Sequence, residues 1–506
     1  MIISTITFVA LAASVKGQVV SSATAAVGSA VTGATSAAGS AVSSATAAVV
    51  SAASSIAVSD LPLPSGFPTS LANYTDILSG TLNFPNASTI ESDLNLNDTE
   101  VAQLPLSALV IPGYANFTNG TWNLRVQGLA YKLPALNDSQ LDDAADKYLP
   151  GVGNLTLNST EETLLRNRTH DLLAIPHSNE NLTFLVSASN SSTSVVNITL
   201  SQPTDASGEF DEFVMLPSSL GLSNSSTTQH ITLYGQNLSG PANGSAILVP
   251  TSGYSIVSDI DDVLRITKVY QPITGLRNSF AEKYVNLPGM PELFEHWEST
   301  LPGVAFHYDT TTPAQLTRTY VEYLFGNYPV GSLDMRPINL TEPSAIFDAR
   351  QTSLVRLFET FPDRKFVLIG DTSSSTLLSA YPSIAQQFPD QIGCIFIRNT
   401  SATDGADELP FDTSGFANLS NSTYFFYTVP EDLYNLNING GQCRNDSIPQ
   451  NLTFGEMGGP FTNGSTNPLS SSSSDSTSTS GARIVGAGLG TVVVAMIVGV
   501  ISGVGF

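Results

Sequence analysis

The sequence predicts an α/β fold with a parallel sheet, preceded by a smaller β-rich domain. Between residues 249 and 440, apolar β-branched runs alternate with helical patterns, as in parallel sheets with crossover helices. Two of these runs end in acids, at Asp259 and Asp371. Open α/β sheets bind ligands at this edge. Between about 100 and 248, short alternating runs separated by Asn, Ser and Gly turns favour an antiparallel β domain, with a sandwich as the expected form.

The predicted elements of the α/β region follow from the period of its apolar residues. Strands are expected at 254–258, 304–308, 366–369 and 392–397, and helices at 313–325, 352–361 and 377–388.

The 506 residues are long enough for two or three domains. We divide the chain into a signal peptide (1–17), an Ala/Ser/Thr-rich low-complexity spacer (18–58), a β-rich domain (60–248), an α/β domain (249–440), a C-terminal extension (441–465), a Ser/Thr-rich stalk (466–482) and an attachment signal for a glycosylphosphatidylinositol (GPI) anchor (483–506).

The two ends of the chain indicate secretion and surface anchoring. A short apolar stretch is followed by small residues near Gly17, which is typical of a signal peptide. Near the other end, small residues from Ser480 precede a spacer and an apolar tail, which is typical of GPI attachment at Ser480. The alternative is a single transmembrane helix at 484–506, although no Lys or Arg follows it.

The distribution of N-glycosylation sequons agrees with a secreted glycoprotein. The sequence contains 22 such sequons, and none begins between Asn243 and Asn339. Because a glycan needs a free surface, this gap fits a face that must stay open, although a buried core would also lack sequons.

The net charge of −24 argues against a nucleic-acid partner. However, 11 of the 19 Lys and Arg residues lie between Arg265 and Arg398, so a phosphate could still be admitted locally. Cys394 and Cys443 are the only cysteines. In an oxidising compartment they could form a disulfide; the alternative is a buried free thiol at Cys394.

The first acidic motif follows the strand expected at 254–258. Asp259 and Asp261 are two residues apart, so in extended chain their side chains point the same way and could share a cation. Asp371 follows Gly370 at the end of another expected strand and could reach the same cation. The alternative for each is an ordinary acidic turn.

Two further polar features lie between these acids. Thr310 follows the strand expected at 304–308 and offers a hydroxyl, while Thr312 and Pro313 are suited to begin a helix whose N–H groups could bind phosphate. Arg350, expected just before the helix at 352–361, could neutralise a phosphoryl oxygen. Each alone would be an ordinary turn or surface residue.

A series of ordered motifs covers roughly residues 250–400: Ser258-Asp259-Ile260-Asp261-Asp262, Leu287-Pro288-Gly289-Met290, Phe306-His307-Tyr308, Phe361-Pro362-Asp363-Arg364-Lys365-Phe366, Gly370-Asp371, and Gln387-Phe388-Pro389-Asp390-Gln391-Ile392 followed by Ile397-Arg398. Together they resemble the catalytic domain of the fungal actin-patch phosphatidate phosphatase family, within the haloacid dehalogenase (HAD) superfamily. The resemblance implies a HAD-like Rossmannoid sheet.

The resemblance also implies a mechanism. Asp259 would attack phosphorus and Asp261 would act as acid and then as base, while Thr310 and Arg350 would hold phosphoryl oxygens. Mg²⁺ would bind the Asp259 carboxylate, the main-chain carbonyl of Asp261 and the Asp371 carboxylate.

The chain departs from the family pattern at several positions. Val263 stands where Thr is commoner, Thr310 replaces Ser and Arg350 replaces Lys. The most serious departure is Thr376, where the family usually has a second metal-site acid. Asp309 is an acid where the family has an apolar residue, and the sequence does not show whether it compensates.

Two functions are therefore considered. The first is a secreted, surface-anchored, Mg²⁺-dependent phosphatase that acts on phosphatidate or a small phosphomonoester. The second is a catalytically inactive cell-surface or cell-wall glycoprotein that retains the phosphatase fold. No G-x-S-x-G, H-E-x-x-H or Walker motif favours another hydrolase class.

Overall fold

The computed structural model describes residues 85–149, 151–152, 155–188, 195–336, 343–407, 411–450 and 456–457. The predicted signal peptide, spacer, stalk and GPI signal, with Ser480, lie outside these residues. No helix within the described ranges is both long and apolar enough to cross a bilayer.

A six-stranded sheet in which all neighbours are parallel forms the α/β region and confirms the predicted fold class. The order is β12–β11–β10–β13–β14–β16. Its strands are β10 (Gly253–Ser258), β11 (Ala305–Pro313), β12 (Ser332–Arg336), β13 (Arg364–Asp371), β14 (Ile392–Arg398) and β16 (Tyr424–Tyr427). All four predicted strands are present, whereas β12 and β16 were not predicted.

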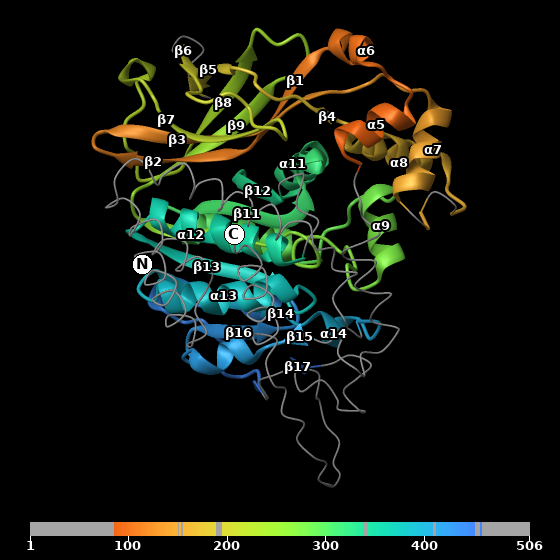
Figure 1. Ribbon diagram of the computed structural model, residues 1–506. Helices are drawn as coiled ribbons and strands as arrows, with labels where there is room; N and C mark the ends of the chain where they lie inside the picture. The colour runs from red at the N-terminus through yellow and green to blue at the C-terminus, as the bar shows by residue number, and fades with distance from the viewer. Residues whose placement is uncertain are drawn as a thin grey trace, which may run out of the picture. The chain divides into compact units, whose positions relative to one another are not determined.

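Helices cover both faces of this sheet. The helices of the region are α9 (Pro272–Phe280), α10 (Met290–Thr300), α11 (Thr317–Asn327), α12 (Pro343–Thr360), α13 (Ser375–Gln387), α14 (Thr400–Thr403) and α15 (Glu431–Tyr434). Helices α12 and α13 lie across one face (Figure 1), where Phe358 stacks on Phe366 of β13. On the other face, Phe294 and Trp297 of α10 stack on aromatic rings of β11 and β14.

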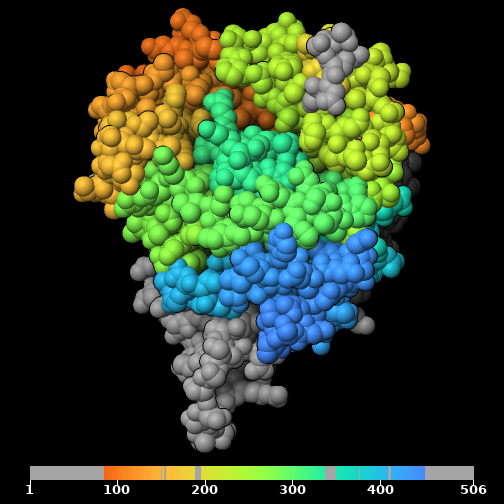
Figure 2. Space-filling model, turned by 180° about the vertical axis from the view of Figure 1, so that it is seen from behind, coloured from red at the N-terminus to blue at the C-terminus, as the bar shows by residue number. Residues whose placement is uncertain are grey.

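The C-terminal part of the described chain packs beside α10. Figure 2 shows these two segments, in blue and green, side by side on one face, where His296 stacks on Tyr434 of α15 with ring centroids 4.4 Å apart. Cys394 of β14 and Cys443 form a disulfide. This bond ties the predicted C-terminal extension to the parallel sheet. Two short strands, β15 (Phe411–Asp412) and β17 (Glu456–Met457), pair with each other.

The β-rich region forms one hydrogen-bonded nine-stranded sheet, not the two separate sheets of a sandwich. Its strands are β1 (Leu106–Ile111), β2 (Gly113–Thr118), β3 (Thr121–Lys132), β4 (Ile175–Pro176), β5 (Thr183–Ala188), β6 (Val195–Thr199), β7 (Glu209–Met215), β8 (Gln229–Gln236) and β9 (Asn243–Val249). The pairs are antiparallel except β2 with β9. Tyr114 and Ile247 of this sheet join the same apolar cluster as α12. The two sheets therefore share part of their core.

Four helices in the β-rich region were not predicted. They are α5 (Ala87–Asp93), α6 (Asp98–Gln103), α7 (Asp138–Tyr148) and α8 (Ser159–Leu172). The last three begin with capping boxes in which Asn97, Asn137 and Asn158 pair with a Glu or Gln three residues later. This capping-box pattern is a local signal for a helix start, so it was available in the sequence. The same three Asn residues also begin sequons.

The predicted start of the helix after β11 was wrong. Strand β11 continues to Pro313, a 3-10 turn follows at Ala314–Leu316, and α11 begins at Thr317. Thr312 caps no helix; its hydroxyl meets Tyr320 instead, with the two oxygens 2.9 Å apart. Arg350 lies within α12, not before it.

Candidate active site

Asp259 directly follows β10 at the carboxyl edge of the parallel sheet. Ser258 is in register with Tyr308 and Ile369, so the next residues on the three strands are Asp259, Asp309 and Gly370. The Asp259 main-chain N–H donates to the Ile369 carbonyl at 2.9 Å. Burial raises the pKa of the Asp259 carboxyl to about 6, although Arg350 acts to lower it.

Arg350 reaches this edge from α12 and lies between two carboxylates. Its Nη2 is 3.5 Å from Asp259 Oδ1, and its Nε is 3.6 Å from Asp309 Oδ2. Arg350 is only 3% exposed, yet its Nε and Nη1 have no hydrogen-bond partner among the described residues. A buried guanidinium whose donors do not all make hydrogen bonds is suited to bind a further anion.

Asp309 completes this cluster, and the sequence could not place it. The structure puts its carboxylate on Arg350, where burial raises its pKa to about 7 despite the arginine. The charges of Asp334 and Asp259 add to this rise. Asp309 therefore acts on Arg350 and Asp259 through charge.

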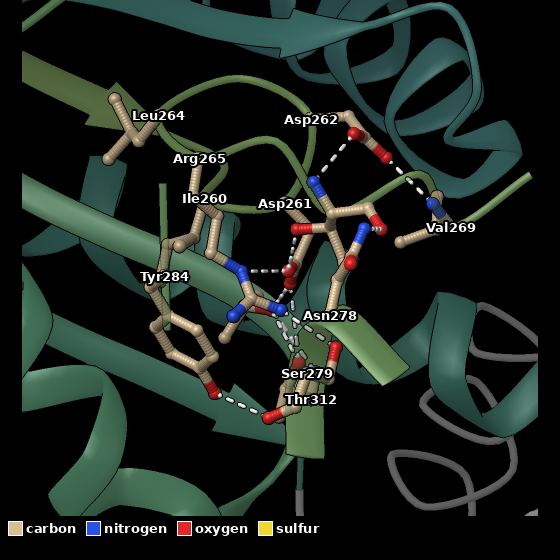
Figure 3. A network of polar contacts seen from close by, with 12 residues as sticks. Ile260, Asp261, Asp262, Leu264, Arg265, Val269, Asn278, Ser279, Tyr284 and Thr312 are labelled. Carbon is tan, nitrogen blue, oxygen red and sulfur yellow. Dashed lines mark hydrogen bonds and ion pairs between the residues drawn. The ribbon is translucent and has the colours of Figure 1, made fainter. Parts of the chain in front are cut away.

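Asp261 lies in a dense network of donors. Its carboxylate accepts hydrogen bonds from five side chains: Arg265, Thr267, Thr310, Thr312 and Tyr320. Figure 3 shows Arg265 between Asp261 and the ring of Tyr284, with its guanidinium carbon 3.7 Å from the ring centroid. Burial alone would raise the pKa of Asp261, but Arg265 and the hydrogen bonds bring it below its ordinary value. This environment favours the ionised carboxylate, which suits a base better than an acid.

Asp262 points away from this network, and its role is structural. Its φ of 57° is left-handed. Its carboxylate accepts main-chain N–H bonds from Thr267, Lys268 and Val269 at 2.7–3.0 Å. Figure 3 shows the bond from Val269. The third acid of the motif therefore folds the loop after β10.

Asp371 ends β13, and its carboxyl is buried and influenced by other acids. Burial first, and then the charges of Asp259 and Asp262, raise its pKa well above its usual range. Asp371 Oδ1 accepts hydrogen bonds from the main-chain N–H and the hydroxyl of Ser373. Thr376, one turn on, contacts Ser374 at 3.2 Å and brings no carboxylate.

Thr310 lies beside Asp261, with its Oγ1 donating to Asp261 Oδ2 at 3.2 Å. The structure thus brings Asp259 to Arg350, and Thr310 to Asp261. Among the described residues, no three His, Cys, Asp or Glu side chains are grouped as a metal-binding cluster. The set implied by the resemblance has only two side-chain carboxylates, of Asp259 and Asp371, and stays a prediction.

Sequence reasoning missed Arg265 and Tyr320. Arg265 lies four residues after Asp261, a spacing that suggests an ion pair. Tyr320 is 59 residues from Asp261, and nothing local connects them. Only the packing of α11 against the loop after β10 brings them together.

Residues 254–399 match the family model described as Phosphatidate phosphatase APP1, catalytic domain. The match covers this segment, and it is what the segment is similar to. The resemblance indicated by the sequence motifs is therefore confirmed, and residues 254–399 are called the APP1-type segment below.

Two curated relatives match the chain over part of their length. Phosphatidate phosphatase APP1 of Saccharomyces cerevisiae is 31% identical over 172 residues, which are 31% of this chain and 27% of the relative. An uncharacterized protein of Schizosaccharomyces pombe is 30% identical over 158 residues, 29% of this chain and 25% of that protein. The chain thus spans about a quarter of the length of the curated relatives that it matches.

Among solved structures, a GH2 beta-galacturonidase from Eisenbergiella tayi aligns with 8% identity and a TM-score of 0.21, covering 59% of this chain and 48% of that one. This similarity is too low to bear on the fold of the APP1-type segment.

Proposed function

We propose that the protein is a Mg²⁺-dependent phosphatase that forms an aspartyl-phosphate on Asp259, with phosphatidate as its most suitable substrate. The observation that carries the proposal is Arg350, a buried cation beside the carboxylate of Asp259 in an APP1-type segment. Two of its nitrogens, Nε and Nη1, donate no hydrogen bond among the described residues. The family of this segment supports the choice of phosphatidate.

In the first half of the reaction, an Asp259 oxygen attacks phosphorus and the bond to the leaving alkoxide breaks. Arg350 and Thr310 hold the phosphoryl oxygens, whose charge would otherwise repel the carboxylate. The alkoxide takes up a proton, for which Asp261 is the family's donor.

In the second half, water attacks the aspartyl-phosphate and releases inorganic phosphate, with Asp261 accepting the proton of the water. The donors around Asp261 favour its ionised form and so support this base role in particular. The carboxylate of Asp259 is regenerated.

The residues present fit a magnesium ion. Asp259 and Asp371 are both buried. Burial first, and then the charge of Asp259, raises the pKa of Asp371, and a cation bound to both groups would favour their ionised forms. Hard oxygen ligands of this kind suit Mg²⁺. Bound there, Mg²⁺ would neutralise negative charge around the phosphoryl group.

Thr376 favours a second candidate, an inactive surface glycoprotein with a retained phosphatase fold. It is half-buried and contributes a hydroxyl bonded to Ser374 where the family usually has an acid.

The full-length chain, purified in detergent, would be assayed with an aryl phosphate and with phosphatidate, with Mg²⁺ or with EDTA. We expect EDTA-sensitive turnover, absent in Asp259→Asn, and a phosphoenzyme that acid quenching traps in the wild type only. Lack of turnover in the wild type would favour the inactive glycoprotein.

We also propose that the protein is secreted and held at the cell surface by a GPI anchor. The sequons, the apolar tail and the disulfide support this location, since disulfides persist in oxidising compartments. Phosphatidylinositol-specific phospholipase C should release the protein from intact cells. Retention after this treatment, with a control GPI protein released, would favour the transmembrane alternative.

A further inference from the structure

Arg125 of β3 lies outside the APP1-type segment but belongs to a charge network that leads to Asp259. Its Nη1 donates to Asp334 Oδ1 at 2.6 Å, and its Nε and Nη2 donate to the two oxygens of Asp211 at 2.8 and 2.9 Å. Only 4% of Arg125 is exposed. On the solvent side, Asp211 also pairs with Arg356 of α12, whose Nη1 is 2.6 Å from Asp211 Oδ2.

Asp334 connects this arginine to the candidate site. It lies on β12 in register with Asp309 of β11. Because in-register residues of neighbouring parallel strands point to the same face, the two carboxylates are neighbours on one face of the sheet. Each has its own arginine, which is Arg125 for Asp334 and Arg350 for Asp309.

We propose that Arg125 is a positioning residue for the phosphoryl site: it neutralises Asp334, so that Arg350 stays between Asp309 and Asp259. The proposal rests on the proposed function for its catalytic consequence. Without Arg125, Asp334 would be a buried carboxylate without its cation, which is strongly unfavourable. The negative charge of Asp334 would then attract Arg350, which pairs with the adjacent Asp309, and draw it away from Asp259.

This role differs from simple packing between the two sheets, and the chain offers a matched control. Gln127 lies two residues further along β3, and its Nε2 donates to the Leu333 carbonyl of the same strand β12 at 2.9 Å. Gln127 is buried and uncharged. Its replacement by Met removes a link between β3 and β12 without exposing the charge of Asp334.

The test compares full-length wild type, Arg125→Met, Arg125→Met/Asp334→Asn and Gln127→Met in detergent. Two quantities are measured: kcat/KM for an aryl phosphate, and the dissociation constant for inorganic phosphate by calorimetry. A shift of the Arg350 charge disturbs both catalysis and phosphate binding. Arg125→Met should therefore lower kcat/KM by about 100-fold and raise the dissociation constant for phosphate by about 100-fold. Gln127→Met should stay within about twofold of wild type, and Asp334→Asn should restore most of the loss.

The outcomes separate the two proposals. If folded Arg125→Met equals wild type, or if the double variant stays as impaired as Arg125→Met, the role of Arg125 is refuted. If the wild type binds phosphate without turnover, the proposed function fails, and the phosphate affinities alone decide the role of Arg125. If the wild type does neither, both proposals fail. Should Arg125→Met not fold, the double variant decides, because a neutral pair should keep near wild-type phosphate affinity and a loss would refute the proposal.

Discussion

Removal of the Cys394–Cys443 disulfide should destabilise the parallel sheet in a measurable way. The bond joins the centre of β14 to a residue 49 positions later. In the chain-entropy description, closing a loop of this length lowers the conformational entropy of the unfolded chain, which stabilises the folded state by about 4 kcal/mol at 25 °C. Replacing Cys443 by Ser is the milder perturbation, because Cys394 is fully buried in β14 and can remain as a thiol.

Trp297 is a suitable reporter of this unfolding. It is 1% exposed and stacks on Phe396, which lies two residues from Cys394 on β14. The chain has two tryptophans, so Trp122→Phe leaves Trp297 as the only one. Urea unfolding followed by its fluorescence should give a free energy of unfolding about 4 kcal/mol lower for Cys443→Ser than for the matched parent.

A reductant supplies the control. It should lower the unfolding midpoint of the parent to that of Cys443→Ser and leave Cys443→Ser unchanged. Thiol labelling of the urea-unfolded chain should find no free cysteine in the parent and one in the variant. Equal midpoints for parent and variant, or two labelled thiols in the parent, would refute the reasoning.

Three further predictions concern other residues. Arg364→Met should lower the free energy of unfolding by at least about 3 kcal/mol, because the buried guanidinium donates to Ser255 and to four main-chain carbonyls. Lys365→Met, at the neighbouring exposed residue, is the control. Equal unfolding midpoints for the two variants would contradict this role of Arg364. Arg265→Met should slow turnover by about 100-fold and allow phosphoenzyme to accumulate, with partial rescue in Arg265→Lys, because Arg265 orients Asp261; an unchanged phosphoenzyme level in quench experiments would exclude this. Glycopeptide mapping should find a glycan at the exposed Asn418 but none at Asn399, which is 1% exposed; an occupied Asn399 would contradict the buried position of that side chain.

The parallel sheet could be predicted from the sequence because its strands are short apolar runs with clear ends. Apolar content and β-branching fix such strands locally, and the acids at their tips mark the carboxyl edge. Strand β12 was missed because Asp334 and Arg336 interrupt its apolar pattern. Both of these charged residues are buried, and Asp334 is bound to Arg125, 209 residues away. No local signal reveals such a partner.

The candidate site was predictable in part for the same reason. Asp259, Asp261 and Asp371 could be found because each follows a recognisable strand. The path of the chain after residue 308 was predicted wrongly, because Thr312-Pro313 is a strong local signal for a helix start. In the structure, β11 continues through these residues, and the Thr312 hydroxyl contacts Tyr320 and Asp261. Tertiary contacts outweigh the local preference here.

The position of Asp309 shows whether this additional acid can replace the carboxylate that is missing at Thr376. The resemblance places Thr376 where the family usually has a second acid near Asp371, and an extra acid elsewhere would be one way to restore that charge. The carboxylate of Asp309 lies on Arg350, and its pKa is raised by burial first and then by the charges of Asp334 and Asp259. The added charge therefore lies on the arginine side of Asp259, while the lost charge belongs to the side of Asp371. If magnesium binds at Asp259 and Asp371, it does so with one carboxylate fewer than is usual in the family, and Thr376→Asp should raise its affinity for the ion.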